Sequence, residues 1–252
     1  MLFDTHAHLN DEAFDKDREE LIEGLAEKGV GFVMNAGCSL ASSKECIALA
    51  EKYPFLYASV GSHPDSADEV CDQVLEQYLE MSRHPKVKAI GEIGLDYYYE
   101  NFDREVQLRA FQMQMELARQ AELPVIVHER DAHGDGMDMV RKFPEIGGVF
   151  HCYSGSPEMA QQLVERGWHI GFTGVLTFKN ARKAVETAAS IPLERIVLET
   201  DCPYMSPEPF RGRRNDPGRL IHMAEKLAEI RNLPVEEIIR ITTENAKRLY
   251  RI

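Results

Sequence analysis

The sequence predicts an α/β protein of the (β/α)8 class, a TIM barrel that forms a single domain over residues 1–252. Short apolar runs recur along the whole chain, and stretches with helical periodicity lie between them. Dividing the 252 residues among eight units gives about 31 residues each, the size of a strand with its helix. Alternating strands and helices of this period predict a parallel sheet, and eight units favour a closed barrel.

Each expected strand is an apolar run of strand length. The helix expected at 103–121 carries apolar side chains at helical spacing, from Val106 to Ala118. Residues 234–250 are typical of two short closing helices, with Thr242 or Thr243 as an N-cap. The expected strands cover residues 1–6, 31–36, 55–60, 87–91, 124–128, 148–151, 168–173 and 195–200.

An open, doubly wound sheet is the competing fold for the same alternation. Such sheets usually bind a nucleotide through a glycine-rich turn after the first strand, whereas this chain has His-Ala-His-Leu-Asn at residues 6–10. No segment rich in proline, glycine or serine divides the chain. The barrel is therefore the better interpretation.

The net charge of −13 argues against a general basic coat for nucleic acid or anionic membranes. An acidic polymer stays possible as a substrate, because a local cationic cleft and bound metals can reverse the field near a site. The five cysteines are odd in number and form no CxxC pair, so no disulfide framework or zinc knuckle is indicated. The first residues contain no basic segment before an apolar stretch, and no apolar run approaches about 18 residues, so we expect a cytoplasmic protein without membrane association. We also expect a monomer without an obligate protein partner.

The end of the first expected strand carries two histidines, His6 and His8. Successive strand side chains point to opposite faces, so these two imidazoles share one face. Neutral imidazole is the commonest nitrogen ligand of metal ions. In a barrel the chemistry lies where strands end, and four further candidate ligands fall at such positions. They are Glu92, His128, His151 and Asp201.

Six donors exceed what one tetrahedral ion requires and suit two divalent ions that share a bridging carboxylate. Glu92 is central in the strand order and is the expected bridge. One ion would bind the first histidine pair with Asp201, and the other would bind His128 and His151. Mixed imidazole and carboxylate donors suit zinc, manganese, iron or nickel better than magnesium, and the identity of the ions stays open.

Each of these residues also has a structural interpretation. A histidine that closes an apolar strand, as His128 and His151 do, is more often a hydrogen-bonded core residue than a ligand. Asp201 alone would serve as a helix N-cap, and Glu92 alone as a buried ion-pair partner. Their conjunction favours the metal site, because unpaired carboxylates on a closed rim are costly to desolvate and bound cations offset that cost.

Distinctive blocks of residues run in order along the chain. They lie at 4–9, 60–64, 91–97, 124–132, 151–155, 198–204, 213–217 and 244–246. Together they resemble the TatD-type metal-dependent deoxyribonucleases. The resemblance implies a TIM barrel of the amidohydrolase superfamily with a divalent metal pair held by the six donors above. It also implies hydrolysis of DNA phosphodiesters, with trimming of 3′ ends as one mode.

The resemblance further implies that His63 and Arg130 face the substrate phosphate. In our hypothesis Asp201 orients a water and accepts its proton, and a protonated His63 stabilises the phosphate or protonates the leaving oxygen. Asp201, Glu92 and His63 are thus the expected catalytic residues. Many relatives carry a second histidine where this chain has Asp65. An anion there would weaken the hold on phosphate or change the preferred substrate.

Two further groups of side chains are candidates for binding a polynucleotide. Three tyrosines, Tyr97 to Tyr99, are candidates for stacking on a base, and at least one of them is expected to pack internally. A cationic group follows the seventh and eighth strands, and solvated surface charges explain each member equally well. Its members are Lys179, Arg182, Lys183, Arg211, Arg213, Arg214 and Arg219.

Buried acids near the ligands have an expected role as well. One of Asp4 and Glu199 should orient a ligating imidazole, because each shares strand parity with a ligand.

Three functions remain open from the sequence. The first is a metal-dependent DNA hydrolase, acting exonucleolytically. The second is an amidohydrolase or esterase for a small molecule or an acyl ester. Glu92, in place of a bridging lysine, disfavours only the cyclic-amide branch of that class. The third is a non-catalytic metal-stabilised binding protein, which six ligands on an open rim make a poor fit.

Overall fold

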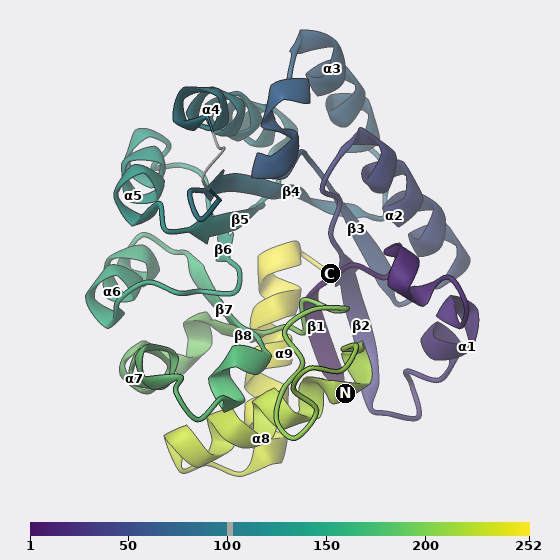
Figure 1. The fold of residues 1–252 in the computed structure, drawn as a ribbon, viewed down its shortest axis with the longest axis vertical. Coiled ribbons are helices and arrows are strands. Elements are labelled where there is room, and N and C mark those ends of the chain that lie inside the picture. The colour runs from purple at the N-terminus through teal and green to yellow at the C-terminus, as the bar shows by residue number, and fades with distance from the viewer. Residues whose placement is uncertain (100–102) are drawn as a thin grey trace. The chain divides into compact units, whose positions relative to one another are not determined.

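The computed structural model describes residues 1–99 and 103–252. Within these residues, eight strands alternate with helices, and the strands follow one another in one sheet in the order of the chain (Figure 1). This is the strand order of a (β/α)8 barrel, so the predicted fold class is confirmed. Internal contacts divide the chain into two units, which are residues 1–35 with 151–252 and residues 36–150. The single domain stays a prediction.

The first unit contains both ends of the chain. Strand β1 pairs in parallel with β2, β7 pairs in parallel with β8, and a parallel bridge joins Ala7 to Cys202. Helices α8 and α9 lie against β1 and β8 (Figure 1). The strands are β1 (Leu2–Ala7), β2 (Val30–Asn35), β7 (His169–Phe172) and β8 (Ile196–Leu198). The α-helices are α1 (Arg18–Glu23), α6 (Pro157–Glu165), α7 (Arg182–Ser190), α8 (Leu220–Arg231) and α9 (Val235–Tyr250). The 3-10 turns are η1 (Glu12–Phe14), η3 (Gly174–Thr177), η4 (Leu193–Arg195) and η5 (Pro217–Arg219).

Strand β1 is buried along its whole length, and the C-terminal helix covers its start. The ring of Phe3 lies 5.4 Å from that of Phe32 and 5.9 Å from that of Tyr250. The hydroxyl of Tyr250 donates a hydrogen bond to the carbonyl of Thr5 at 3.0 Å. Aromatic packing at one end of β1 therefore fixes the strand that carries His6 at the other.

The second unit has the same alternation. Strand β4 pairs in parallel with β3 and β5, and β5 pairs in parallel with β6. The strands are β3 (Leu56–Val60), β4 (Val87–Asp96), β5 (Val125–Arg130) and β6 (Gly148–Phe150). The helices are α2 (Leu40–Lys52), α3 (Asp72–Met81), α4 (Arg104–Ala121) and α5 (His133–Lys142), with the 3-10 turn η2 (Pro64–Glu69). Asp103 caps α4 by accepting hydrogen bonds from the amides of Glu105 and Val106.

Gly94 decides how closely β4 approaches β5. It pairs with His128 and has a φ of +145°, which L-residues with a side chain rarely adopt. A Cβ at this position would lie 1.9 Å from the carbonyl oxygen of His128. Only glycine lets the two strands run together at the residue that presents the His128 imidazole.

Strands β4 and β5 are longer than the predicted 87–91 and 124–128. They continue to Asp96 and Arg130, which pair with each other in the ladder. Glu92 and His128 therefore lie within strands, whereas the sequence predicted them at strand ends. Glycines at 91 and 94 give β4 the appearance of ending early. The boundaries of the other six strands agree with those expected to within two residues.

The prediction of two helices at 234–250 is wrong, because one helix, α9, covers Val235–Tyr250. The hydroxyl of Thr242 donates to the carbonyl of Ile238 at 2.8 Å, and the hydroxyl of Thr243 donates to the carbonyl of Met1 at 3.0 Å. Both hydroxyls are satisfied inside a continuous helix and cap nothing. None of the helices among the described residues has the length and apolar character needed to cross a membrane.

Candidate metal centre

Four predicted ligands meet in the first unit, and we call them the β1–β8 cluster: His6, His8, His151 and Asp201. The Nε2 atoms of His6 and His8 lie 3.1 Å apart. Oδ1 of Asp201 lies 3.3 Å from Nε2 of His8 and 3.7 Å from Nε2 of His6. Donors about 2.1 Å from a tetrahedral ion stand about 3.4 Å from one another. The three donor atoms therefore have the spacing that one divalent ion requires.

Backbone hydrogen bonds hold the carriers of these ligands together. The amide of Asp201 donates to the carbonyl of His6 at 2.9 Å, and the amide of His8 donates to the carbonyl of Cys202 at 2.8 Å. Asp201 itself has a φ of 55°, in the left-handed region that aspartate tolerates better than most residues. The turn after β8 thus continues the sheet pairing and brings its carboxylate to the histidines of β1.

Buried Asp4 fixes this turn from the side of β1. Its carboxylate accepts hydrogen bonds from the amide of Thr200 at 2.9 Å and from the hydroxyl of Thr200 at 2.5 Å. Complete burial outweighs these bonds and raises the pKa of Asp4 to about 7. The side-chain amide of Asn215 donates to the carbonyl of Thr200 at 2.9 Å. The residue before Asp201 is therefore held at its amide, hydroxyl and carbonyl.

Buried Glu199 lies beside the fourth ligand, His151. Its Oε1 is 3.7 Å from Nδ1 of His151 and accepts the amide of Cys152 at 2.5 Å. The ring of His151 stacks on that of His6, with centroids 4.0 Å apart and planes 9° from parallel. A Cβ at Gly171 would lie 2.6 Å from the Glu199 carboxylate, so glycine leaves room for this acid. Glu199 is therefore the acid that lies beside an imidazole, whereas Asp4 organises the turn.

The neighbouring imidazoles keep Asp201 ionised. Burial raises the pKa of this carboxyl, but the hydrogen bond with His8 and the charges of His151 and His6 together hold it below its ordinary value. An anion surrounded by three nitrogen donors attracts a divalent cation.

Three more side chains meet in the second unit, and we call them the β3–β5 cluster: His63, Glu92 and His128. Oε1 of Glu92 lies 2.9 Å from Nδ1 of His128 and 3.8 Å from Nε2 of His63. The donor atoms of these three residues lie within 4.8 Å of one another, close enough to hold an ion. The rings of His63 and His128 are 4.4 Å apart. His63, expected at the phosphate, therefore lies beside two of the predicted ligands.

A second carboxylate, Asp96, completes this cluster. Its Oδ2 lies 3.1 Å from Nε2 of His128, so the imidazole is held between Asp96 and Glu92. Burial alone would lower the pKa of His128, yet the hydrogen bonds to the two carboxylates raise it to about 10. Asp96 was not predicted as a site residue, although it follows Glu92 by four positions and therefore lies on the same side of an extended strand.

Cys38 was missed as well, and no spacing in the sequence marks it. Its thiol donates to Oε2 of Glu92 at 3.4 Å, and the amide of Glu92 donates to the carbonyl of Gly37 at 2.6 Å. The carboxylate of Glu92 is thus positioned by the loop before α2 as well as by β4.

Of the two residues expected to face a phosphate, His63 belongs to the β3–β5 cluster and Arg130 follows His128 by two positions on β5. The guanidinium of Arg130, at the end of β5, lies 3.5 Å from the ring centroid of exposed Tyr98. Nδ1 of His63 accepts the amide of Asp65 at 3.2 Å and lies 3.4 Å from the Asp65 carboxylate. Of the three tyrosines, Tyr97 donates its hydroxyl to Asp135 and packs internally, while Tyr98 and Tyr99 are exposed.

Both clusters suit divalent cations by the chemistry of their donors. The assignment of the six residues as ligands, the bridging role of Glu92 and the sharing of one ion by His151 and His128 stay predictions.

Comparison with known proteins agrees with this chemistry. The family model described as TatD related DNase matches residues 3–251. The uncharacterized metal-dependent hydrolase YabD of Bacillus subtilis is 42% identical, with all of both chains covered. The 3′-5′ ssDNA/RNA exonuclease TatD of Salmonella typhimurium is 30% identical, with 100% of this chain and 99% of that protein covered.

A solved structure supports the same relationship. The YjjV protein of Escherichia coli, a TatD homologue, superimposes with a TM-score of 0.94 at 33% identity, covering 100% of this chain and 98% of that one. The resemblance seen in the sequence is therefore confirmed, and the chain belongs to the TatD-related DNase family of metal-dependent hydrolases.

Proposed function

We propose that this protein hydrolyses the phosphodiester bonds of single-stranded DNA, releasing nucleotides from an end of the strand. The observation that carries the proposal is the pair of donor clusters, each centred on a carboxylate among imidazoles. A family relative named as an exonuclease of single-stranded DNA and RNA supports the choice of substrate.

The β1–β8 cluster would hold one divalent ion, and Glu92 and His128 of the β3–β5 cluster would hold another. Bound ions of this kind polarise phosphoryl oxygens and lower the pKa of water from 15.7 towards about 7. The chain's own residues must then orient the water, take its proton and fix the phosphate.

Asp201 is the group proposed to take the proton. Its pKa is held below the ordinary value, so the carboxylate is ionised at neutral pH and able to accept. Asp4 and Asn215 fix the turn that carries it, which reduces the reorganisation needed during the reaction.

Arg130 and His63 are the groups proposed to hold the phosphate. Stacking on Tyr98 occupies the face of the Arg130 guanidinium and leaves its N–H edge available for a planar, bidentate contact with an anion. His63 would stabilise the phosphate or protonate the leaving oxygen.

The proposal is tested by Asp201→Asn on a panel of substrates. The wild-type protein should release nucleotides from single-stranded DNA in a manner abolished by a chelator. The variant should lose turnover by at least about 10³-fold while keeping its melting temperature, because the substitution removes the proton acceptor and a charged metal donor but keeps the shape of the side chain.

The panel also contains RNA, a chromogenic phosphodiester and an acyl ester. Metal-dependent turnover confined to the acyl ester would contradict the proposal and favour an esterase. An Asp201→Asn protein that keeps most of its rate would remove Asp201 from the role of base.

A further inference from the structure

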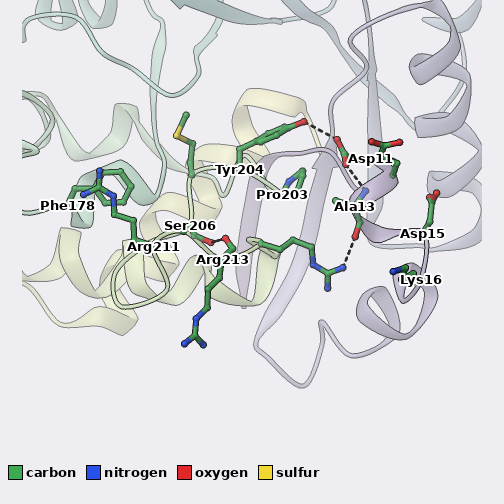
Figure 2. Close-up of a pocket in the computed structure, with 14 residues that line it drawn as sticks. Asp11, Ala13, Asp15, Lys16, Phe178, Pro203, Tyr204, Ser206, Arg211 and Arg213 are labelled. Carbon is green, nitrogen blue, oxygen red and sulfur yellow. Dashed lines mark hydrogen bonds between the residues drawn. The ribbon is translucent and has the colours of Figure 1, made fainter.

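A cavity of about 1000 Å³ lies within the first unit, outside the donor cluster. One wall is the segment after β1, residues 11–16, and the other is the loop after β8, residues 203–214, with Phe178 at its edge (Figure 2). None of the six predicted metal ligands lines it.

The cavity begins next to the β1–β8 cluster. Tyr204 lines it and follows Asp201 by three residues, and its ring meets that of His8 edge-on with centroids 6.3 Å apart. The Tyr204 hydroxyl donates to Asp11 across the cavity at 3.0 Å, as Figure 2 shows. The residue is nevertheless 55% exposed. An aromatic surface therefore lies open to solvent beside a proposed metal ligand.

Cations gather around the cavity despite the strongly acidic chain. Four cationic side chains line it against three carboxylates, in a protein of net charge −13. One of the four is structural, because Arg214 forms a two-pronged ion pair with Asp17 and donates to the carbonyl of Ala13. The others are Lys16, Arg211 and Arg213.

Arg211 and Arg213 have no carboxylate partner among residues 1–99 and 103–252. Arg211 stacks on Phe178 with its guanidinium 4.3 Å from the ring centroid, which leaves its N–H edge available. Arg213 is exposed, and its carbonyl accepts the hydroxyl of Ser206 at 2.7 Å. The loop is thus fixed while its two guanidinium groups stay open to an anion.

One residue couples this wall to the donor cluster. Buried Asn215 donates its side-chain amide to the carbonyls of Thr200 and Tyr204, at 2.9 and 2.7 Å, and its backbone amide to the carbonyl of Pro203. The aromatic surface and the turn of Asp201 are therefore held in a fixed mutual geometry.

We propose that this cavity binds the part of a single-stranded polynucleotide that adjoins the bond to be cleaved, with one base stacked on Tyr204 and backbone phosphates on Arg211 and Arg213. Open aromatic faces beside unpaired guanidinium groups are the chemistry of single-strand binding, since a duplex hides the base faces. The carboxylates of residues 11–15 would repel phosphates, so the backbone runs along the loop of Arg211 and Arg213. This inference rests on the proposed function.

Binding of a fluorescent, phosphorothioate-linked DNA decamer, which resists cleavage, tests the cavity by anisotropy. The full-length protein is used, both loaded with manganese and in chelator. Tyr204→Leu should weaken binding at least about tenfold, and Tyr204→Phe should not, because stacking needs the ring and not the hydroxyl. Arg211→Ala with Arg213→Ala should weaken binding and lower the salt dependence by about one unit for each arginine.

Arg182→Ala is the matched control, because Arg182 is exposed, pairs with Glu186 and does not line the cavity. It should bind the decamer as the wild type does. Melting temperatures confirm that each variant is folded.

The outcomes separate the inference from the function on which it rests. DNA that is hydrolysed while the Tyr204 and arginine variants bind like the wild type overturns the cavity and leaves the nuclease intact. A wild-type protein that does not bind the decamer also overturns it. Binding that depends on Tyr204, in a protein without phosphodiester turnover, supports the cavity and refutes the nuclease.

Discussion

The β1–β8 and β3–β5 clusters differ in how imidazoles and carboxylates are balanced. In the first, one ionised carboxylate, Asp201, faces three imidazoles. In the second, two carboxylates, Glu92 and Asp96, hold one imidazole between them, and the pKa of His128 rises to about 10. A proton therefore occupies the second cluster at neutral pH when no metal is bound.

The two clusters therefore respond differently to metal ions and to pH, although both consist of imidazoles and carboxylates. A cation entering the β1–β8 cluster meets donor atoms already 3.1 to 3.7 Å apart. A cation entering the β3–β5 cluster must also displace the proton of His128. Metal binding at the second cluster is therefore coupled to proton release.

We expect the largest loss of turnover from removing a metal ligand, and a smaller loss from removing a residue that lies beside the ligands. His6→Ala removes a donor at the centre of the β1–β8 cluster, so we expect loss of bound metal and a fall in turnover of about 10³-fold or more. His63→Ala should keep the metal and lose about 10²-fold, the contribution of a general acid. Elemental analysis of bound metal and steady-state rates measure both. Loss of metal from His63→Ala would instead identify His63 as a ligand of the β3–β5 cluster.

The number of protons released when metal binds tests the difference between the two clusters. Manganese titrated calorimetrically near pH 7, in two buffers of different ionisation enthalpy, should release about one proton for the ion that binds His128. As pH increases towards the pKa of His128, the affinity for that ion should rise about tenfold for each pH unit. Asp96→Asn removes one of the two carboxylates and should move the end of this rise to lower pH. Binding without proton release would contradict the description of the β3–β5 cluster.

The pH dependence of folding distinguishes the clusters in metal-free protein. The pKa of Asp4 is raised from 3.8 to about 7, so its contribution to stability is present below pH 4 and lost as pH rises to about 7. The raised pKa of His128 gives a contribution that is complete below its unfolded pKa of about 6.5 and lost as pH approaches 10.

Asp4→Asn should therefore remove the loss between pH 4 and 7 and leave the loss above pH 7. The effect is on the order of 4 kcal/mol, from 1.36 kcal/mol for each pKa unit. Urea denaturation in chelator, from pH 4.5 to 9, measures both regions. Parallel curves for the variant and the wild type would show that Asp4 has an ordinary pKa.

Donors whose positions follow from the alternation of side chains along a strand could be predicted from the sequence. Donors whose positions depend on where a strand ends could not. His6 and His8 share a face by parity, and Asp201 follows a short apolar run. Asp96 obeys the same parity with Glu92, but it lies past two glycines that suggested the end of β4. Position 94 requires glycine because a side chain there would collide with the carbonyl of His128, a contact visible only in the fold.

Contacts between distant segments account for the other omissions. Asn215 acts on Thr200 and Tyr204 through hydrogen bonds that no local pattern encodes. The cationic group after β7 and β8 divides for the same reason. Arg182, Arg214 and Arg219 pair with Glu186, Asp17 and Asp216. Arg211 and Arg213, which line the cavity together with Arg214, have no carboxylate partner among residues 1–99 and 103–252.

The last prediction concerns Asp65, an exposed acid next to His63. Its carboxylate is 67% exposed and lies 3.4 Å from Nδ1 of His63, so it adds a negative charge beside a proposed phosphate contact. Asp65→Asn should lower the KM for single-stranded DNA about two- to threefold at low salt, and the gain should vanish at high salt. Asp68→Asn, in the same turn η2, is the matched control. Equal gains from both variants would attribute the effect to general repulsion, whereas a gain from Asp65→Asn alone would place the action of Asp65 at His63.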